Sequence, residues 1–270
     1  MNMFQVDAFT DRVFSGNPAA VLVLENWLDD EMMLALAEEN NLAETAFAVP
    51  RTDGEWDLRW FAPLHEVDFC GHATLATAHV LASEFGVKGT MTFRTRVGLL
   101  KVAQREAGYQ LDIPALPPEA LTQLPKELDC VFENEPAKIF RNFENIFVDV
   151  GSEREVRDFV PDLMRIAQLG PVGLVVTGRG DGRSGAAFVS RYFAPGAGIP
   201  EDHVTGSTHA TLVPYWSEVL GAKGHRAFQA SKRGGWLDCE LVGDRVTLVG
   251  NAVTFMEASI RLPQGSTVVT

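Results

Sequence analysis

The sequence contains an internal repeat, which constrains the fold more than any other feature. Arg59-Trp-Phe-Ala-Pro63 recurs as Arg191-Tyr-Phe-Ala-Pro195, and Cys70-Gly-His-Ala-Thr-Leu75 corresponds to Thr205-Gly-Ser-Thr-His-Ala210. From the second pair onward, matching residues stay 135 positions apart, which is half of the 270-residue chain. A duplication in this register predicts two similar domains with one site built from both copies.

Apolar periodicity and chain breakers predict the same order of elements in both halves. The expected strands of the first half lie near residues 3–9, 19–24, 44–49, 55–61, 90–95, 98–104 and 109–113, with a helix after Leu28 and another over 71–85. The second half has expected helices over 153–168 and 206–220, and strands near 145–150, 172–177, 185–194, 226–230, 236–241 and 245–258.

A proline-rich stretch, Ile113-Pro-Ala-Leu-Pro-Pro118, is the predicted linker. We therefore place a first repeat domain at residues 1–115 and a second at 116–270, with the extreme C-terminus packing back on the first domain as an option. Strands outnumber helices in each half, and the long apolar helix lies between strands. The predicted fold class is α+β, with two pseudo-symmetric domains that each curl a mostly antiparallel sheet around a central helix.

The balance of charges bears on the partners. With 36 acidic and 23 basic residues the formal net charge is −13, and such a chain repels nucleic acid and anionic lipid unless a basic patch reverses the field. The sequence has no run of Lys or Arg of that kind, no apolar stretch of spanning length and no leader pattern at its start. We expect a cytoplasmic protein that binds neither nucleic acid nor membrane.

Cysteine and histidine spacings do not indicate a metal site. The three cysteines, Cys70, Cys130 and Cys239, are an odd number at wide spacing, which fits neither a disulfide framework nor a CxxC pair. No HExxH motif is present. The sequence therefore predicts reduced thiols and no metal.

The two glycine-containing loops each open a predicted helix. Helix N-termini present unpaired N–H groups and a partial positive charge that can hold a carboxylate, so we expect a small anionic substrate there. The alternative is that Thr205, Ser207 and Asp68 act only as helix caps.

Ionisable residues gather at the same loops and could supply a base, an acid and a hydrogen-bond donor. They are His65, Glu66, Asp68, Cys70 and His72 in the first half and Glu201, Asp202, His203, Ser207 and His209 in the second. We interpret Glu66, Glu201 and His65, taken singly, as solvated. Glu44 begins an apolar strand, where burial is expected to raise its pKa and suit it to acid–base work, with a helix-end salt bridge as the alternative.

Five motifs occur in order over nearly the whole chain. They are the Asn17-Pro18 turn, Leu42-Ala-Glu-Thr45, Arg59-Trp-Phe-Ala-Pro63, Cys70-Gly-His-Ala-Thr74 and Glu201-Asp-His-Val-Thr-Gly-Ser207. Together they resemble the phenazine biosynthesis PhzF-like family, within the diaminopimelate epimerase fold. The resemblance implies an isomerase without metal or organic cofactor and with its active site in the cleft between two similar domains. It places a general acid/base glutamate at Glu44, a cleft histidine at His72, a second carboxylate at Asp202 and a supporting serine at Ser207.

The leading hypothesis is an isomerase of a small carboxylate-bearing metabolite. Glu44 would move a proton between carbons, and His72 and Asp202 would orient the substrate or share the proton. N–H groups of Gly71, Gly206 and Ser207 would hold the carboxylate, with Cys70 and Thr205 also counted as substrate-binding.

Epimerases of the wider fold carry a cysteine at both loop positions, whereas this chain has Cys70 and Thr205. The rival hypotheses are a racemase or epimerase that pairs Cys70 with a non-thiol partner, and an inert binding protein. The substrate, the roles of His203 and His209 and the oligomeric state stay open, with a homodimer as one option.

Overall fold

The computed structural model describes residues 1–262, 268 and 269, and the chain divides into two compact units. Unit 1 comprises Met1–Asp112 and Val249–Thr270, and unit 2 comprises Ile113–Leu248. Each unit is described by itself below. The predicted boundary between the two repeat domains, after residue 115, stays a prediction.

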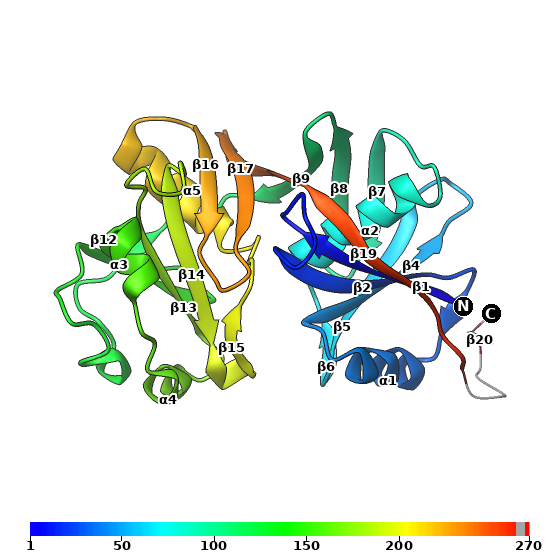
Figure 1. The fold of residues 1–270 in the computed structure, drawn as a ribbon, viewed down its shortest axis with the longest axis horizontal. Coiled ribbons are helices and arrows are strands. Elements are labelled where there is room, and N and C mark those ends of the chain that lie inside the picture. Colours follow the sequence, from blue (N-terminus) through cyan, green and yellow to red (C-terminus); the bar gives the residue numbers. More distant parts are fainter. Residues whose placement is uncertain (263–267, 270) are drawn as a thin grey trace. The chain divides into compact units, whose positions relative to one another are not determined.

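Unit 1 is dominated by strands (Figure 1). Its elements are β1 (Asn2–Ala8), β2 (Asn17–Val23), β3 (Trp27–Leu28), α1 (Asp30–Asn40), β4 (Glu44–Pro50), β5 (Trp56–Ala62), β6 (His65–Val67), α2 (Gly71–Ser83), β7 (Thr90–Thr95), β8 (Gly98–Arg105), most of β9 (Gly108–Pro114), β19 (Ala252–Ser259) and β20 (Val268–Val269).

Unit 2 repeats this order. Its elements are β10 (Glu119–Ala120), a 3-10 turn (Lys126–Leu128), β11 (Lys138–Arg141), β12 (Asn145–Ser152), α3 (Glu153–Asp158), α4 (Leu163–Ile166) with a 3-10 turn (Ala167–Leu169), β13 (Gly173–Arg179), β14 (Phe188–Ala194), a 3-10 turn (Pro195–Ala197), β15 (Ile199–Asp202), α5 (His209–Leu220), β16 (Gly224–Gln229), β17 (Gly235–Val242) and most of β18 (Arg245–Gly250).

Strand pairing is the same in both units. In unit 1, β2 pairs parallel with β4, β4 antiparallel with β5, β5 parallel with β7 and β7 antiparallel with β8. In unit 2, β12, β13, β14, β16 and β17 repeat this sequence of orientations, and β15 forms a hairpin with β14 as β6 does with β5. The predicted α+β class and the repeat are confirmed.

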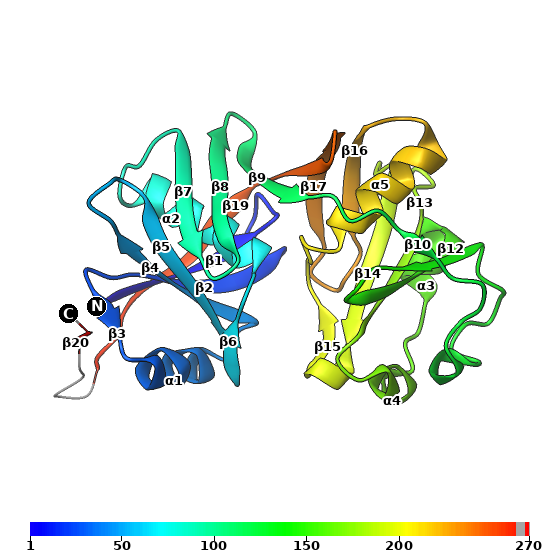
Figure 2. The ribbon, with the colours of Figure 1, turned by 180° about the vertical axis from the view of Figure 1, so that it is seen from behind.

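Each sheet is covered on both faces. Helix α2 packs against β1, β2, β4, β8 and β19, whereas α1 packs against β4 and β5 (Figure 2). Six of the seven residues of β2 are at least nine-tenths buried. Helix α2 packs against this strand, and its Ala20 and Leu22 join Met33 and Ala37 of α1 in one apolar cluster. Ten of the thirteen residues of α2 are buried, so it is the predicted central helix.

Two predicted elements were wrong. The helix expected over 153–168 ends at Asp158, because Pro161 cannot continue it, and resumes as α4 at Leu163. The strand expected over 245–258 is two strands, since the chain breaks at Asn251 and β19 continues in unit 1, where it pairs antiparallel with β1.

Candidate active site

Unit 1 brings three predicted residues together from two elements. Glu44 is the first residue of β4, Cys70 is the N-cap of α2, and His72 lies in the first turn of α2. Glu44 Oε2 is 3.2 Å from His72 Nε2, and Cys70 Sγ is 3.4 Å from His72 Nδ1. The His72 side chain is only 6% exposed and that of Glu44 15%. The chain therefore forms a buried ion pair with a thiol beside it.

Asn17 was missed as a site residue, although its turn was noted. Its side chain is fully buried, and Nδ2 lies 3.2 Å from Nδ1 of His72. An amide nitrogen donates only, so this contact suits the neutral ring, in which Nδ1 accepts and the proton is on Nε2, facing Glu44. The charged ring carries a proton on both nitrogens.

The electrostatics of this group favour a charged pair beside a neutral thiol. Burial raises the pKa of Glu44, but the charge and hydrogen bonding of His72 outweigh burial, so that pKa lies below its ordinary value. The pKa of His72 lies well above 6.5, because Cys70 and Glu44 overcome the opposing effect of burial. Burial raises the pKa of Cys70 to about 11. The raised pKa expected for Glu44 from burial alone was wrong.

The same three side chains offer one donor atom each to a metal, and these atoms lie within 4.8 Å of one another. A tetrahedral ion would need a fourth ligand and a deprotonated thiol. The raised pKa of Cys70 opposes the second requirement. The absence of a metal stays a prediction.

In unit 2, the loop between β15 and α5 holds Asp202, Thr205, Gly206 and Ser207. The Thr205 hydroxyl donates to Asp202 Oδ2 at 2.5 Å, and the Thr205 N–H donates to Oε1 of Gln229 at 2.8 Å. Gly206 and Ser207 lie in the turn before α5, which begins at His209 rather than at 206. Gln229, fully buried at the end of β16, was also missed. The sequence feature that could have identified Gln229 is a polar residue at an inward position of an alternating strand.

The duplicated helices differ from the others at their N-termini. Asp29, Ser152 and Asp162 cap α1, α3 and α4 through side-chain hydrogen bonds. The N-caps of α2 and α5, Cys70 and Thr208, make no side-chain cap bond. The alternative that Thr205, Ser207 and Asp68 serve as the caps is therefore wrong. The first N–H groups of these two central helices lack the usual side-chain acceptor.

Two carboxylates interpreted as solvated are ion-paired instead. Glu66 accepts two hydrogen bonds from Arg59, both at 2.7 Å, and Glu201 accepts two from Arg191, at 2.7 and 3.1 Å. These duplicated pairs tie β5 to β6 and β14 to β15, directly before each loop. His65 is exposed, as expected.

His203 and His209, whose roles the sequence did not predict, differ in burial. His209 is fully buried at the start of α5, where its Nδ1 lies 3.0 Å from the Thr205 carbonyl and burial lowers its pKa to about 4. His203 is half-buried in the loop, where its carbonyl accepts a hydrogen bond from Ser231.

The strand registers show which residue of unit 2 corresponds to Glu44. Thr45 pairs with Phe61, and Leu174 pairs with Phe193 in the repeated motif, so Glu44 corresponds to Gly173. A Cβ at Gly173 would collide with Asn145 Oδ1 and would lie 2.6 Å from the Tyr192 hydroxyl. Unit 2 therefore has neither the carboxylate nor the space for one.

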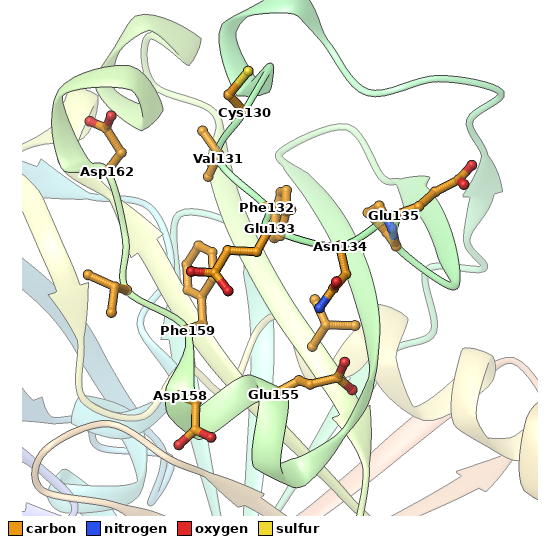
Figure 3. Close-up of a pocket in the computed structure, with 13 residues that line it drawn as sticks. Cys130, Val131, Phe132, Glu133, Asn134, Glu135, Glu155, Asp158, Phe159 and Asp162 are labelled. Atoms are coloured by element: carbon orange, nitrogen blue, oxygen red, sulfur yellow. The ribbon is translucent and has the colours of Figure 1, made fainter.

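A separate cavity of about 330 Å³ lies in unit 2 (Figure 3). Residues 130–136 line it together with Glu155, Asp158, Phe159 and Asp162. None of the predicted site residues lines this cavity.

Known proteins resemble the chain over nearly its whole length. The family model described as phenazine biosynthesis-like protein matches residues 6–258. An uncharacterized isomerase of Pseudomonas aeruginosa is 43% identical over 97% of this chain and 99% of its own. A human phenazine biosynthesis-like domain-containing protein is 38% identical over 96% of this chain and 98% of its own. A crystal structure of a PhzF-family protein from Enterococcus faecalis has a TM-score of 0.91 at 41% identity and covers 97% of this chain and 99% of its own.

The wider fold includes a probable proline racemase of Agrobacterium radiobacter, with a TM-score of 0.60 at 12% identity, covering 98% of this chain and 94% of its own. The fold and these relatives define an isomerase. The chain belongs to the phenazine biosynthesis-like (PhzC-PhzF) family, so the resemblance found in the sequence is confirmed. Among the described residues, no helix is long and apolar enough to cross a membrane.

Proposed function

We propose that this isomerase acts without a cofactor on a small carboxylate-bearing metabolite, with Glu44 as the group that moves a proton between carbon positions. The observation that carries the proposal is the buried ion pair of Glu44 with His72 at 3.2 Å. A carboxylate whose pKa is lowered in this way is ionised at neutral pH and can accept a proton at once. His72 then balances the charge of Glu44 or shares the proton.

The second part of the proposal concerns the substrate carboxylate. N–H groups of Gly71, Gly206 and Ser207 hold it, supported by the absence of side-chain caps at α2 and α5. Asp202 orients the substrate, and Cys70 and Thr205 complete the two loops. One substrate contacted by both loops is the arrangement that the duplication favours, in a cleft between the repeat domains.

The rival reaction is epimerisation with Cys70 as one of two bases. The 3.4 Å contact of Cys70 Sγ with His72 Nδ1 favours it, because the neutral form of His72 could take the thiol proton. The raised pKa of His72 opposes it, since the charged ring has no free nitrogen. The raised pKa of Cys70 opposes it, and the corresponding residue of the other loop is Thr205, which has no thiol.

One experiment separates these hypotheses. Candidate carboxylates that bind in calorimetric titration are incubated with the protein in D₂O and recovered for NMR. A proton shift places deuterium on a new carbon, epimerisation places it at an inverted stereocentre, and an inert protein returns the ligand unlabelled. Turnover that survives dialysis against a chelator supports the absence of a metal, and turnover lost with the chelator and restored by a metal contradicts it.

A structure with bound carboxylate is the direct test of the binding part. We expect carboxylate oxygens within about 2.7–3.2 Å of N–H groups from both helix starts, with Glu44 facing a ligand carbon. A ligand that touches only one loop contradicts the proposal. We also propose a cytoplasmic location and a homodimer, and light scattering of the purified protein tests the second.

A further inference from the structure

Gln229 has a buried amide that the proposed reaction does not use directly. Its side chain is fully buried at an inward position of β16. Oε1 accepts from the Thr205 N–H at 2.8 Å, while Nε2 donates to the Asp202 carbonyl at 3.0 Å and to Thr205 Oγ1 at 3.2 Å. The N–H donor on one side and the carbonyl acceptor on the other fix the orientation of the amide.

This orientation sets the direction of the next hydrogen bond. An amide nitrogen only donates, so Thr205 Oγ1 accepts from Gln229 and its single proton is directed to Asp202 Oδ2. The three side chains therefore form a one-way chain of donors that ends on the carboxylate. Hydrogen bonds to a carboxylate oxygen are short and directional, so this chain of donors fixes where the oxygen lies.

Thr205 is also held through its main chain. Its carbonyl accepts from Thr208 Oγ1 at 2.8 Å and lies 3.0 Å from His209 Nδ1. Its N–H, carbonyl and hydroxyl are thus all engaged within unit 2, and its hydroxyl is fixed in place against Asp202.

The corresponding loop of unit 1 has a related arrangement. The Cys70 carbonyl accepts from Thr74 Oγ1 at 2.6 Å, and Thr74 corresponds to His209. Cys70 Sγ lies against the ionisable residue His72, as Thr205 Oγ1 lies against Asp202. The counterpart of Gln229 in the 135-residue register is Arg94, which is exposed, so the buried amide belongs to unit 2 alone.

We infer that Thr205 and Gln229 are positioning residues that hold the Asp202 carboxylate in one orientation, so Thr205 serves the reaction through Asp202. This inference rests on the proposed role of Asp202 in binding or proton sharing. It deepens the proposal by assigning the Thr205 hydroxyl proton to Asp202 instead of to the substrate.

The test begins on the protein without substrate. Aspartate side-chain carboxyl carbons are labelled with ¹³C, the Asp202 signal is assigned with Asp202→Asn, and its chemical shift and line width are measured at neutral pH. Thr205→Val removes the hydroxyl and keeps the branched shape, whereas Thr205→Ser keeps the hydroxyl and is the matched control. We expect the Asp202 signal to move and broaden in Thr205→Val, because the carboxylate loses its fixed donor, and to keep its original shift and width in Thr205→Ser.

Gln229→Met provides the second variant and leaves the Thr205 hydroxyl free to rotate. We expect a smaller change of the Asp202 signal than in Thr205→Val. An Asp202 signal in Thr205→Val equal to that in Thr205→Ser overturns the inference. If Thr205→Val does not fold, a signal in Gln229→Met equal to that of the unaltered protein overturns it.

Turnover of the substrate then separates this inference from the proposed function. If both hold, kcat falls in Thr205→Val together with the change of the Asp202 signal, and Thr205→Ser restores both. If the Asp202 signal changes while kcat does not, the positioning stands and the proposed role of Asp202 falls.

Discussion

The two units share a scaffold and differ at the matched positions where chemistry would occur. Unit 1 has Glu44, Cys70 and His72, while the same positions in unit 2 hold Gly173, Thr205 and Ser207. The strand pairings, the uncapped central helices and the Arg–Glu pairs are common to both. Scaffold features have thus persisted in both copies, whereas a buried charged pair at the loop is found in unit 1 and a network of uncharged donors around Asp202 in unit 2.

The largest expected effect tests whether unit 1 alone supplies the proton-transfer group. Glu44→Gln removes the titratable oxygen with little change of shape, so we expect turnover to fall by about 10²–10⁴-fold and the melting temperature to stay within a few degrees. Steady-state kinetics and thermal unfolding measure both, with exposed Glu39→Gln as the control. Retained turnover removes Glu44 from the mechanism, and loss of the fold assigns it a structural role.

The next prediction concerns the position of unit 2 that corresponds to Glu44. Gly173→Ala places a Cβ against Asn145 and the Tyr192 hydroxyl, so we expect a loss of about 1–3 kcal/mol in the free energy of unfolding. Denaturant unfolding measures it. Gly224→Ala is the control for the substitution itself, because Gly224 also begins a strand and a Cβ there meets no atom within 4 Å. Equal losses in the two variants would show that the space at Gly173 is not restricted.

Lowering the pH should change the stability of the two units in opposite directions through their buried histidines. His209 has a pKa lowered to about 4, so the unfolded chain binds its proton first, and the contribution of His209 to stability is complete above about pH 6.5 and lost as the pH falls toward 4. His72 has a raised pKa, so its contribution is complete below about pH 6.5 and lost as the pH rises through its folded value.

Hydrogen exchange in each unit as a function of pH measures this difference. We expect the His209 contribution to unit 2 to amount to about 3 kcal/mol and His209→Gln to flatten the acid slope there while unit 1 is unchanged. The same acid slope in the variant would exclude His209 as its source.

The smallest effect is expected at Cys70, where the two loops differ in chemistry. Its pKa of about 11 keeps the thiol neutral at working pH, and Cys70→Ser retains a small polar atom beside His72. We expect turnover to fall less than about tenfold, measured with the Glu44→Gln series. A variant that is inactive while it folds and binds ligand would instead favour the epimerase hypothesis.

The sequence contained enough to predict the repeat, the two central helices and the residues of both loops, because these depend on patterns along the chain. The break of the helix before Pro161 could also have been predicted from the sequence. The direction of the Glu44 pKa shift could not be predicted, because it depends on the 3.2 Å contact of Glu44 with His72, two residues far apart in sequence. Asn17 and Gln229 were missed for the same reason, as their roles come from packing against His72 and Thr205.

The discontinuity of unit 1 has a consequence for how the protein is made. Residues 113–248 form unit 2 without interruption, but unit 1 requires β19, which pairs with β1 and contacts α2. During synthesis the chain emerges from its N-terminus, so unit 2 can complete its set of strands while unit 1 still lacks an edge. The part of the enzyme that is translated first is therefore completed last, and α2, the helix that carries His72, is fully packed only when β19 has left the ribosome.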